Sequence, residues 1–560
     1  MQEKILIYQV LPRLYGNKVC NNRAGGTLAE NGCGKMNDFT DSELKRIADY
    51  GFTHIWYTGL IEHATQTDYS EFNIAQDHPA VVKGVAGSPY AIKDYYDIDP
   101  DLAVNVKRRM KEFEALVART HAAGLKFIID FVPNHVARQY KSDAKPARVK
   151  DLGEDDDNSR HFAPNNNFYY ICESPLRKGW MSQAGNDEYK PYKEYPAKAT
   201  GNDVFSAQPG ENDWYETVKL NYGVDYLGGH RCHFNPIPDT WKKMTNILLF
   251  WAKKGVDAFR CDMAEMVPCE FWTYAIAEVK KKYPHICFIA EVYNPTEYRN
   301  YIRRGGFDYL YDKVGLYDTL RAVICGYAPA SAITHAWQSV DDIHEHMLNF
   351  LENHDEQRIA SDFFAGDARK ALPALVVSAC MRSNPFMVYA GQELGERGMD
   401  AEGFSGTDGR TTIFDYWGVM SLQRMSLGEI YLRPEEQYIY GYYRRILNLC
   451  QRESALNQGV FYDLTYANMD HTGGFNPDRH YAFIRKHDNE TLLICANFSD
   501  ESRAFGVRIP AHAFEFLNLR SGAQIATDLI GGEIQSLELR PDAHTSIYVP
   551  AQGAVILKIK

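Results

Sequence analysis

Short apolar segments with strand propensity alternate with longer amphipathic segments through most of this 560-residue chain. KILIYQVLPRLYG, HIWYTGL, LKFIIDFVPNH and GVDAFRCDM are strand-like, and segments such as VKRRMKEFEALVARTHAAG between them have helical periodicity. About eight strand–helix units follow one another in this way, which predicts a (β/α)8 barrel. A doubly wound open sheet is the alternative, but no phosphate-binding glycine pattern follows the first strand.

Two stretches interrupt this alternation. Between residues 136 and 226 the chain is polar and irregular, and so long an irregular stretch within a compact domain indicates an inserted domain. Beyond residue 457, short alternating strands are separated by Asn, Asp and Gly, which is typical of an antiparallel β-sandwich. We therefore expect a catalytic barrel at 1–135 and 227–456, an inserted domain at 136–226 and a C-terminal β-sandwich domain at 457–560.

Two local patterns near the start of the barrel give further expectations. Thr40-Asp41-Ser42-Glu43 is a capping box, so it predicts a helix that begins there and ends at Gly51. The segment from His63 to Asp101, which includes SPYAIKDYYDIDPDLA, is predicted to be a long loop.

The composition of the chain limits the kinds of partner it is expected to bind and the compartment in which it is expected to work. The net charge of −12 disfavours nucleic acid, and no apolar segment is long enough to cross a bilayer, so neither nucleic acid nor membrane is expected as a partner. The beginning of the chain lacks a basic region followed by an apolar run. The eleven cysteines include no CxxC pair, and most lie in apolar patterns. These features predict a reduced, cytoplasmic protein.

Charged residues stand at the carboxyl ends of the predicted strands, which is where the active sites of such barrels lie. Arg260 and Asp262 end the fourth strand, Glu291 ends the fifth, and Asp355 ends the seventh. The same ends also present Asn134, His135 and His354. We expect three carboxylates, two histidines and an arginine to meet at one mouth.

Each residue alone also has a structural explanation. Arg260 and Asp262 fit a buried salt bridge, and Asp262 fits a helix cap. A histidine at a strand end is more often a satisfied polar group than a ligand-binding one. Asp130, inside the third strand, is expected to orient its neighbours. The combination favours chemistry, because three converging carboxylates are more charge than packing requires.

Paired carboxylates of this kind serve glycoside hydrolysis, in which one attacks the anomeric carbon and the other transfers protons. A nearby Arg260 is expected to lower the pKa of Asp262 and keep it ionised, as a nucleophile requires. The apolar run ICFIA before Glu291 favours the protonated carboxyl of a general acid/base. Asp355 is expected to bind sugar hydroxyls and favour the oxocarbenium-like transition state.

Four segments resemble the conserved regions of the α-amylase family of glycoside hydrolases: DFVPNH, GVDAFRCDM, FIAEVY and FLENHD, in that order. YAGQELG resembles the family's stretch at strand eight, and the inserted and C-terminal domains also match its architecture. The resemblance implies that Asp262 is the nucleophile, Glu291 the acid/base and Asp355 the transition-state stabiliser. It further implies a sugar site lined by Tyr90, His135, Arg260, His354 and Arg358.

The chain departs from the family pattern at two places. Glu265 and Met266 stand where α-amylases commonly have the Lys-His pair that contacts the leaving-group sugars. TVKLN is more similar to the MPKLN of neopullulanases and cyclomaltodextrinases than to the LPDLN of α-amylases. The family implies Asn134 as a ligand of structural Ca²⁺, although Lys219 replaces an Asp that helps to bind the ion in many relatives.

We therefore expect a retaining hydrolase that cleaves α-1,4 bonds in maltodextrins and other starch-derived α-glucan oligosaccharides and requires no cofactor. A transglycosidase or isomerase of the same family is the first alternative, because it shares the covalent intermediate. A non-enzymatic amylase-like transporter subunit is a remote alternative. Such subunits tend to lose the carboxylates and to carry a membrane segment, whereas this chain keeps the carboxylates and has no such segment.

Overall fold

The computed structural model describes residues 4–177 and 191–560. Eight parallel strands close into a barrel in the order β1-β16-β15-β14-β13-β12-β5-β2, which confirms the predicted (β/α)8 fold. The strands are β1 Leu6–Val10, β2 His54–Tyr57, β5 Lys126–Phe131, β12 Ala258–Cys261, β13 Cys287–Ala290, β14 Tyr309–Tyr311, β15 Met347–Phe350 and β16 Phe386–Tyr389. Their carboxyl ends meet at one mouth.

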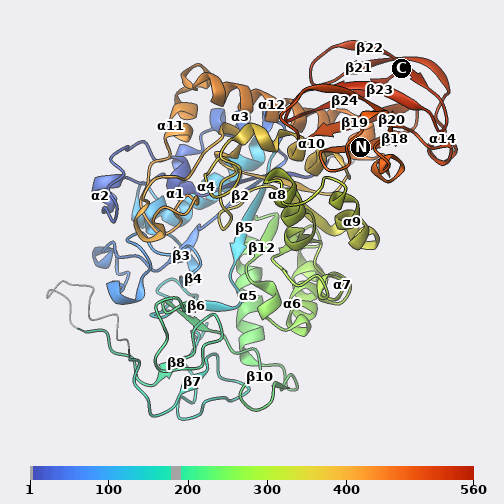
Figure 1. Ribbon diagram of the computed structural model, residues 1–560. Helices are drawn as coiled ribbons and strands as arrows, with labels where there is room; N and C mark the ends of the chain where they lie inside the picture. Colours follow the sequence, from blue (N-terminus) through green and yellow to red (C-terminus); the bar gives the residue numbers. More distant parts are fainter. Residues whose placement is uncertain (1–3, 178–190) are drawn as a thin grey trace.

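Helices surround the barrel on its outer side (Figure 1). The longer ones are α3 Asp41–Asp49, α4 Arg109–Ala122, α5 Asp239–Lys253, α6 Cys269–Lys282, α9 Ala332–Ser339, α10 Leu372–Cys380, α11 Met420–Leu427 and α12 Pro434–Arg452. At the start of α3 the Thr40 hydroxyl accepts a hydrogen bond from the Glu43 amide at 3.2 Å, so the predicted helix start is confirmed.

Alternating side chains divide each strand between two apolar layers. In β2, Trp56 belongs to the cluster inside the barrel, whereas Ile55 and Tyr57 belong to the larger core beneath the helices. This period of two is what a strand buried on both faces requires. The inner layer holds Ile7, Trp56, Ile128, Ala258, Ile289, Tyr311, Leu348 and Met387. A closed and packed barrel leaves its strand ends as rigid supports for a site.

The prediction of a long loop from His63 to Asp101 is wrong. The segment contains strand β4 Ile92–Ile98, which pairs antiparallel with β3 Ile61–His63 just before it, and Glu62 lies opposite Asp94. All seven residues of β4 are buried, including Lys93, Asp94 and Asp97. Polar residues dominate this strand, so its sequence resembles a loop although the protein encloses it.

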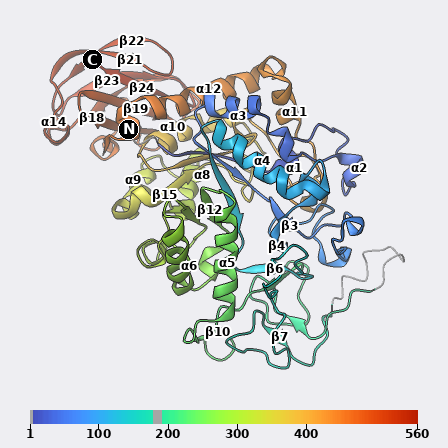
Figure 2. The same ribbon diagram turned by 180° about the vertical axis from the view of Figure 1, so that it is seen from behind.

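The chain between β5 and α5 forms a separate lobe at one side of the barrel (Figures 1 and 2). Its two ends pair with each other, because β6 His135–Ala137 lies antiparallel to β9 Thr217–Lys219. Within the lobe, β7 Tyr170–Ile171 pairs with β8 Ala197–Lys198, and β10 Val224–Asp225 pairs with β11 Arg231–Cys232. We call residues 136–226 the inserted segment.

The C-terminal part forms two antiparallel sheets at the side of the barrel away from the inserted segment (Figure 2). The larger contains β17 Val460–Asp463, β18 His480–His487, β19 Glu490–Asn497, β24 Gly553–Ile559, β21 Gly522–Asp528 and β22 Ile534–Leu539; the smaller contains β20 Arg503–Arg508 and β23 His544–Val549. Phe483 faces the barrel core, whereas its neighbour Ile484 faces the core between the two sheets.

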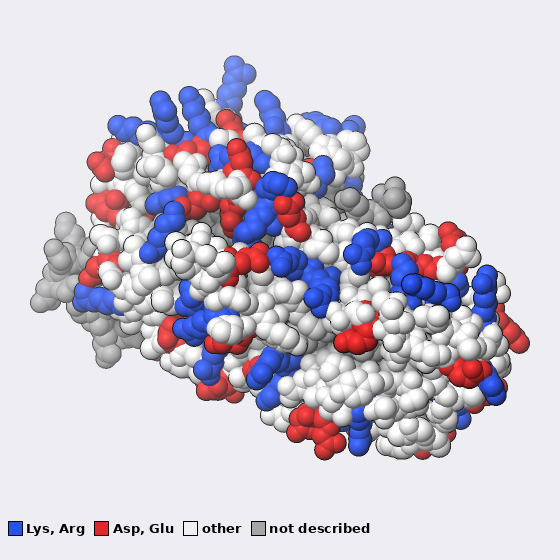
Figure 3. All heavy atoms as spheres, turned by 90° about the horizontal axis from the view of Figure 1, so that it is seen from above, with Lys and Arg blue, Asp and Glu red and all other residues white. Residues whose placement is uncertain are grey.

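All eleven cysteines are free. Of the six in apolar patterns that were expected to be buried, Cys261, Cys380, Cys450 and Cys495 are buried, whereas Cys287 and Cys325 are half-buried. No helix among the described residues is long and apolar enough to cross a membrane. On the face shown in Figure 3, acidic and basic side chains are interspersed among uncharged ones.

Candidate active site at the barrel mouth

Arg260 lies at the centre of the mouth, between two of the predicted catalytic carboxylates. Its Nη1 is 2.8 Å from Oδ1 of Asp262, and its Nη2 is 3.0 Å from Oε2 of Glu291. β12 supplies Arg260 and Asp262, and β13, which is its parallel neighbour, leads into Glu291. One guanidinium thus holds both carboxylates close together, as a retaining mechanism requires.

Aromatic rings enclose this guanidinium. Arg260 is 1% exposed and lies 5.0 Å from the ring of Trp56 and 5.5 Å from the rings of Tyr90 and Tyr311. Its Nε donates to the Tyr311 hydroxyl at 3.1 Å. Contact with aromatic faces and several hydrogen bonds fix the guanidinium plane, and a fixed guanidinium fixes the carboxylates.

Asp130 contacts the same cluster from below. Its Oδ2 accepts hydrogen bonds from Trp56 Nε1 at 3.1 Å and from the Gly59 amide at 3.2 Å, and its Oδ1 lies 3.7 Å from Arg260. Burial raises the pKa of Asp130 to about 6. These contacts agree with the expectation that Asp130 orients its neighbours.

Glu291 has its two carboxylate oxygens in different surroundings. Oε1 accepts a hydrogen bond from the Tyr293 hydroxyl at 2.6 Å, and Oε2 accepts one from the Met263 amide at 2.8 Å. Met263 has a φ of +44°, a backbone conformation that is costly for a side chain of this kind. The turn after Asp262 is therefore shaped so that its amide points at Glu291.

Asp355, which follows β15, is the third of the predicted catalytic carboxylates. Its Oδ2 lies 3.1 Å from His354 Nε2, which is also 2.6 Å from the Tyr90 hydroxyl. The Asp355 side chain is 42% exposed, far more than Asp262 or Glu291, so it faces the open part of the mouth. Asp355, His354 and Tyr90 therefore form the wall that an entering ligand meets.

Burial sets the protonation of these groups. It raises the pKa of Asp262 despite the opposing charge of Arg260, and Glu291 and Asp355 add to the rise. The predicted net lowering of the Asp262 pKa is therefore wrong, because desolvation of a buried carboxylate outweighs one guanidinium. Enclosure and the charge of Glu291 raise the pKa of Asp355 to about 7, and burial lowers that of His354 well below its usual range.

His135 lies beside Tyr90 but has different electrostatics. It is 2% exposed, is hydrogen-bonded to the Tyr90 backbone, and packs edge-on against Trp214 of the inserted segment. Burial and the charges of Lys219 and Lys83 lower its pKa to about 3. His135 is therefore neutral, so it can donate one hydrogen bond and accept another.

Asn134, the candidate Ca²⁺ ligand, is held by a cation of the chain itself. The Lys219 ammonium donates to Asn134 Oδ1 at 2.8 Å, pairs with Asp203 and is 2% exposed. A Ca²⁺ ion needs several oxygen ligands and would be repelled by an ammonium in contact with one of them. These residues do not fit a calcium site.

Arg358 belongs to a different cluster from the carboxylates. Its Nη1 is 2.8 Å from Glu352, and its other two nitrogens donate to Thr411 and to the Ala390 carbonyl. It also stacks 4.0 Å from the Tyr389 ring. The structure thus gathers the other predicted side chains at the mouth and places the Arg358 guanidinium beneath the loop after β16.

Several residues of the mouth were not predicted. Tyr293 and Tyr311 bond to Glu291 and Arg260, Gln9 Nε2 lies 2.7 Å from His354 Nδ1, and Arg410 donates to the Asp355 carbonyl at 2.6 Å. Tyr311 and Gln9 occur at strand ends, a position that could have identified them. Nothing in the sequence singles out Arg410, which lies in a loop.

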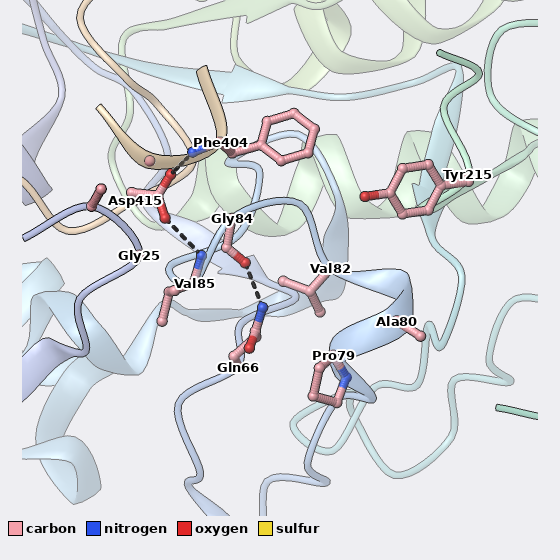
Figure 4. Close-up of a pocket in the computed structure, with 12 residues that line it drawn as sticks. Gly25, Gln66, Pro79, Ala80, Val82, Gly84, Val85, Tyr215, Phe404 and Asp415 are labelled. Carbon is pink, nitrogen blue, oxygen red and sulfur yellow. Dashed lines mark hydrogen bonds between the residues drawn. The ribbon is translucent and has the colours of Figure 1, made fainter. Parts of the chain in front are cut away.

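A pocket of about 460 Å³ is formed by the loops that also carry parts of the mouth. Figure 4 shows Phe404 and Tyr215 projecting into it from opposite sides. Asp415 ties two of its lining loops together by accepting hydrogen bonds from the amides of Val85 and Phe404, both at 2.9 Å. Aromatic side chains on loops that are fixed by hydrogen bonds suit a ligand that has flat apolar faces and carries hydroxyl groups at its edges.

The family model described as alpha amylase, catalytic domain, matches residues 26–416. Alpha-amylase 3 of Dictyoglomus thermophilum is 23% identical over 446 residues, which is 76% of this chain and 77% of the relative. A cyclomaltodextrinase of Geobacillus thermopakistaniensis is 21% identical over 87% of this chain and 66% of its own length.

Solved structures with the same fold cover almost the whole chain. A maltogenic alpha-amylase from Thermotoga neapolitana matches with a TM-score of 0.63 at 19% identity, covering 99% of this chain and 98% of the other. An alpha-amylase from Geobacillus thermoleovorans, solved with acarbose, also gives 0.63 at 17% identity, covering 100% and 98%.

Proposed function

Because the chain belongs to the alpha-amylase family, we propose that it is a retaining glycoside hydrolase that cleaves α-1,4-glucosidic bonds. The observation that carries this proposal is the pair of carboxylates, Asp262 and Glu291, held on one guanidinium with Asp355 beside them. The two carboxyl groups of retaining enzymes lie about 5–5.5 Å apart, a spacing that suits a shared guanidinium.

In the first step, an oxygen of the Asp262 carboxylate attacks the anomeric carbon. The bond from that carbon to the leaving sugar breaks, and Glu291 donates its proton to the departing oxygen. The product is a glycosyl ester on Asp262. Contact with Arg260 at 2.8 Å favours the ionised carboxylate that must attack, in opposition to its burial.

In the second step, water replaces the departed sugar. The Glu291 carboxylate accepts a proton from this water while the water oxygen attacks the anomeric carbon and releases Asp262. Tyr293 and the Met263 amide hold Glu291 in place through both steps. The exposed Asp355 carboxylate faces the entering sugar, where it can accept its hydroxyl hydrogen bonds and stabilise positive charge on the ring.

The proposed substrates are maltodextrins and related α-glucan oligosaccharides. This choice is supported by relatives that are named alpha-amylase and cyclomaltodextrinase, and by a structural neighbour solved with acarbose. The pocket between Phe404 and Tyr215 offers aromatic faces for glucose units beyond the cleaved bond.

Replacing Glu291 by Gln tests the catalytic assignment. Glu291→Gln keeps the shape but removes the proton donor of the first step and the proton acceptor of the second, so kcat on a 4-nitrophenyl maltooligosaccharide should fall at least 100-fold. Glu297→Gln, in the same loop, changes a side chain that bonds to Asn300 and should leave kcat unchanged. Wild-type activity in Glu291→Gln would overturn the assignment of the acid/base.

The products from maltotriose separate hydrolysis from sugar transfer. A hydrolase should release glucose and maltose from the first minutes, with the new reducing end initially in the α configuration by NMR. Oligosaccharides larger than maltotriose as the main early products would show that a sugar hydroxyl, and not water, resolves the intermediate.

We also propose that the protein works in a reducing compartment such as the cytoplasm. Support comes from the cysteines: the Sγ atoms of Cys380 and Cys450 lie 3.9 Å apart in the core, yet both remain thiols. Buried thiols of this kind serve as small apolar side chains. Recovery of the native protein in a membrane, periplasmic or secreted fraction would contradict this location.

A further inference from the structure

Three carboxylates meet inside the β3–β4 pair, apart from the three predicted to be catalytic. Glu62 of β3 and Asp94 and Asp97 of β4 each place an oxygen within 4.8 Å of the other two, and all three residues are buried. β3 and β4 place them there because Glu62 lies opposite Asp94 in the register.

Two of these carboxylates have protein partners. Both oxygens of Asp94 are hydrogen-bonded, to the amides of Tyr96, Asp143 and Ala144 and to the Ser142 hydroxyl. Asp97 pairs with the Arg109 guanidinium, whose Nε lies 2.9 Å from Oδ1.

Glu62 is different. It is 1% exposed, and neither of its carboxylate oxygens has a hydrogen-bond partner among the described residues. A buried carboxylate without any partner costs several kcal/mol, so an unoccupied arrangement of this kind is unfavourable. The side chain nevertheless points its oxygens at Asp94 and Asp97.

The charges around the group do not balance. Arg109 neutralises one of the three carboxylates. Lys93, the other nearby cation, pairs with Asp77 at 2.9 Å. Glu62 and Asp94 therefore share a buried site, and neither forms an ion pair with a cation of the described residues.

We propose that Glu62, Asp94 and Asp97 bind a hard divalent cation, Ca²⁺ or Mg²⁺. Such ions prefer oxygen ligands, and Ca²⁺ binds them at 2.3–2.6 Å, so oxygens on either side of the ion lie roughly 4.6–5.2 Å apart. The three oxygens lie within 4.8 Å of one another, which is close enough for one ion to contact all of them. Thiols and imidazoles are absent from this set of ligands, which disfavours zinc and copper.

The proposed ion would join three parts of the chain. Glu62 and Asp94 come from the β3–β4 pair, Arg109 on Asp97 begins α4, and Ser142, Asp143 and Ala144 on Asp94 belong to the inserted segment. The segment between β3 and β4 also carries Tyr90 of the active site. Binding should therefore stabilise the wall of the mouth without taking part in the reaction.

Metal content and thermal stability test the site. Wild-type protein is first loaded by dialysis against buffer that contains at least about 1 equivalent of Ca²⁺ or Mg²⁺, and excess ion is then removed. Mass spectrometry should find about one ion retained per chain. Stripping with EDTA should lower Tm by about 3 °C or more, and return of Ca²⁺ or Mg²⁺ alone should restore it.

Two variants identify the residues responsible. Glu62→Gln removes the unpaired charge, so it should bind no ion, and its metal-free form should have a higher Tm than metal-free wild type. Glu71→Gln changes an exposed side chain a short distance along the same segment and should bind as wild type does. The proposal fails if wild type retains no ion and its Tm does not respond, or if Glu62→Gln binds the ion as tightly as wild type.

Discussion

At the scale of single residues, Asp355 combines two properties that rarely occur together. Its side chain is 42% exposed, yet its pKa is raised to about 7 by enclosure and by the charge of Glu291. A carboxyl whose pKa is raised on folding binds protons more tightly in the native than in the unfolded state. Its contribution to stability is therefore fully present below the unfolded-state pKa of about 3.9 and is lost as the pH rises to about 7.

The upward direction of the pKa shift gives a prediction for Asp355→Asn. At pH 8 the Asp355 carboxylate of the wild type is ionised although it lies near Glu291 and is partly enclosed. The variant has no such charge, so it should be more stable, by about 1 kcal/mol after allowance for solvent screening. The difference should shrink as the pH falls below about 7 and nearly vanish below about pH 4, where Asp355 is protonated in the folded and unfolded states alike. Tm measured from about pH 3.5 to pH 8 checks this. A constant difference across that range would show that Asp355 has an ordinary pKa in the native state.

The residues that sequence could identify are those whose chemistry and position both stand out. Asp262, Glu291 and Asp355 follow buried strands directly, so the barrel alone determines that they meet. Lys219 and Arg358 show the limit of this reasoning. Asn134 lies in DFVPNH and Glu352 in FLENHD, but only tertiary packing decides that the Lys219 ammonium contacts Asn134 and the Arg358 guanidinium contacts Glu352.

At the scale of elements, the turn after β12 and the loop after β13 are tied together by Glu265. Its Oε2 accepts hydrogen bonds from the amides of Tyr293 at 3.1 Å and Asn294 at 3.0 Å. Tyr293 in turn donates to Glu291. Glu265 stands where α-amylases commonly have a residue that contacts the leaving sugar, and here it supports the acid/base loop.

We therefore expect Glu265 to act as a positioning residue. Glu265→Ala frees two amides and should lower kcat about 10-fold while changing KM less than threefold. Glu265→Gln keeps a carbonyl oxygen for both amides and should retain most of the activity. A large rise in KM with unchanged kcat in both variants would instead indicate direct contact with the sugar.

The β3–β4 pair is the element that sequence reasoning missed. Strands are usually recognised by apolar alternation, but β4 reads IKDYYDI, with two aspartates and a lysine. Burial of these groups depends on partners from elsewhere, namely Arg109, Asp77 and the inserted segment. A pattern in one segment cannot reveal charges that distant segments neutralise.

At the scale of the whole molecule, the order of the barrel strands followed from the repeated units because parallel connections allow few arrangements. The two faces of the C-terminal sheet were less evident. One face packs on the barrel core and the other on the second sheet, so β18, β19 and β24 are buried on both sides. The junction between barrel and sandwich is thus an apolar interface with a few buried polar groups.

Arg485 is the most connected of these polar groups. It lies in β18 and is fully buried. Nη1 donates to the Cys380 carbonyl at 2.8 Å, and Nη2 donates to the carbonyls of Leu456 and Gly459 at 3.1 and 2.7 Å. Burial lowers the pKa of Arg485 only to about 10, so it remains charged at neutral pH. One side chain thus joins the end of α10 to the chain that enters the sandwich.

Arg485→Met should weaken this junction. The variant keeps the apolar stem but leaves buried carbonyls without donors, which should cost about 3 kcal/mol in the free energy of unfolding. In differential scanning calorimetry we expect a lower Tm, or separation of one transition into two as the sandwich uncouples from the barrel. Arg520→Met, at an exposed position of the same domain, should melt as wild type does. If Arg485→Met also melted as wild type, apolar packing alone would hold the two domains together.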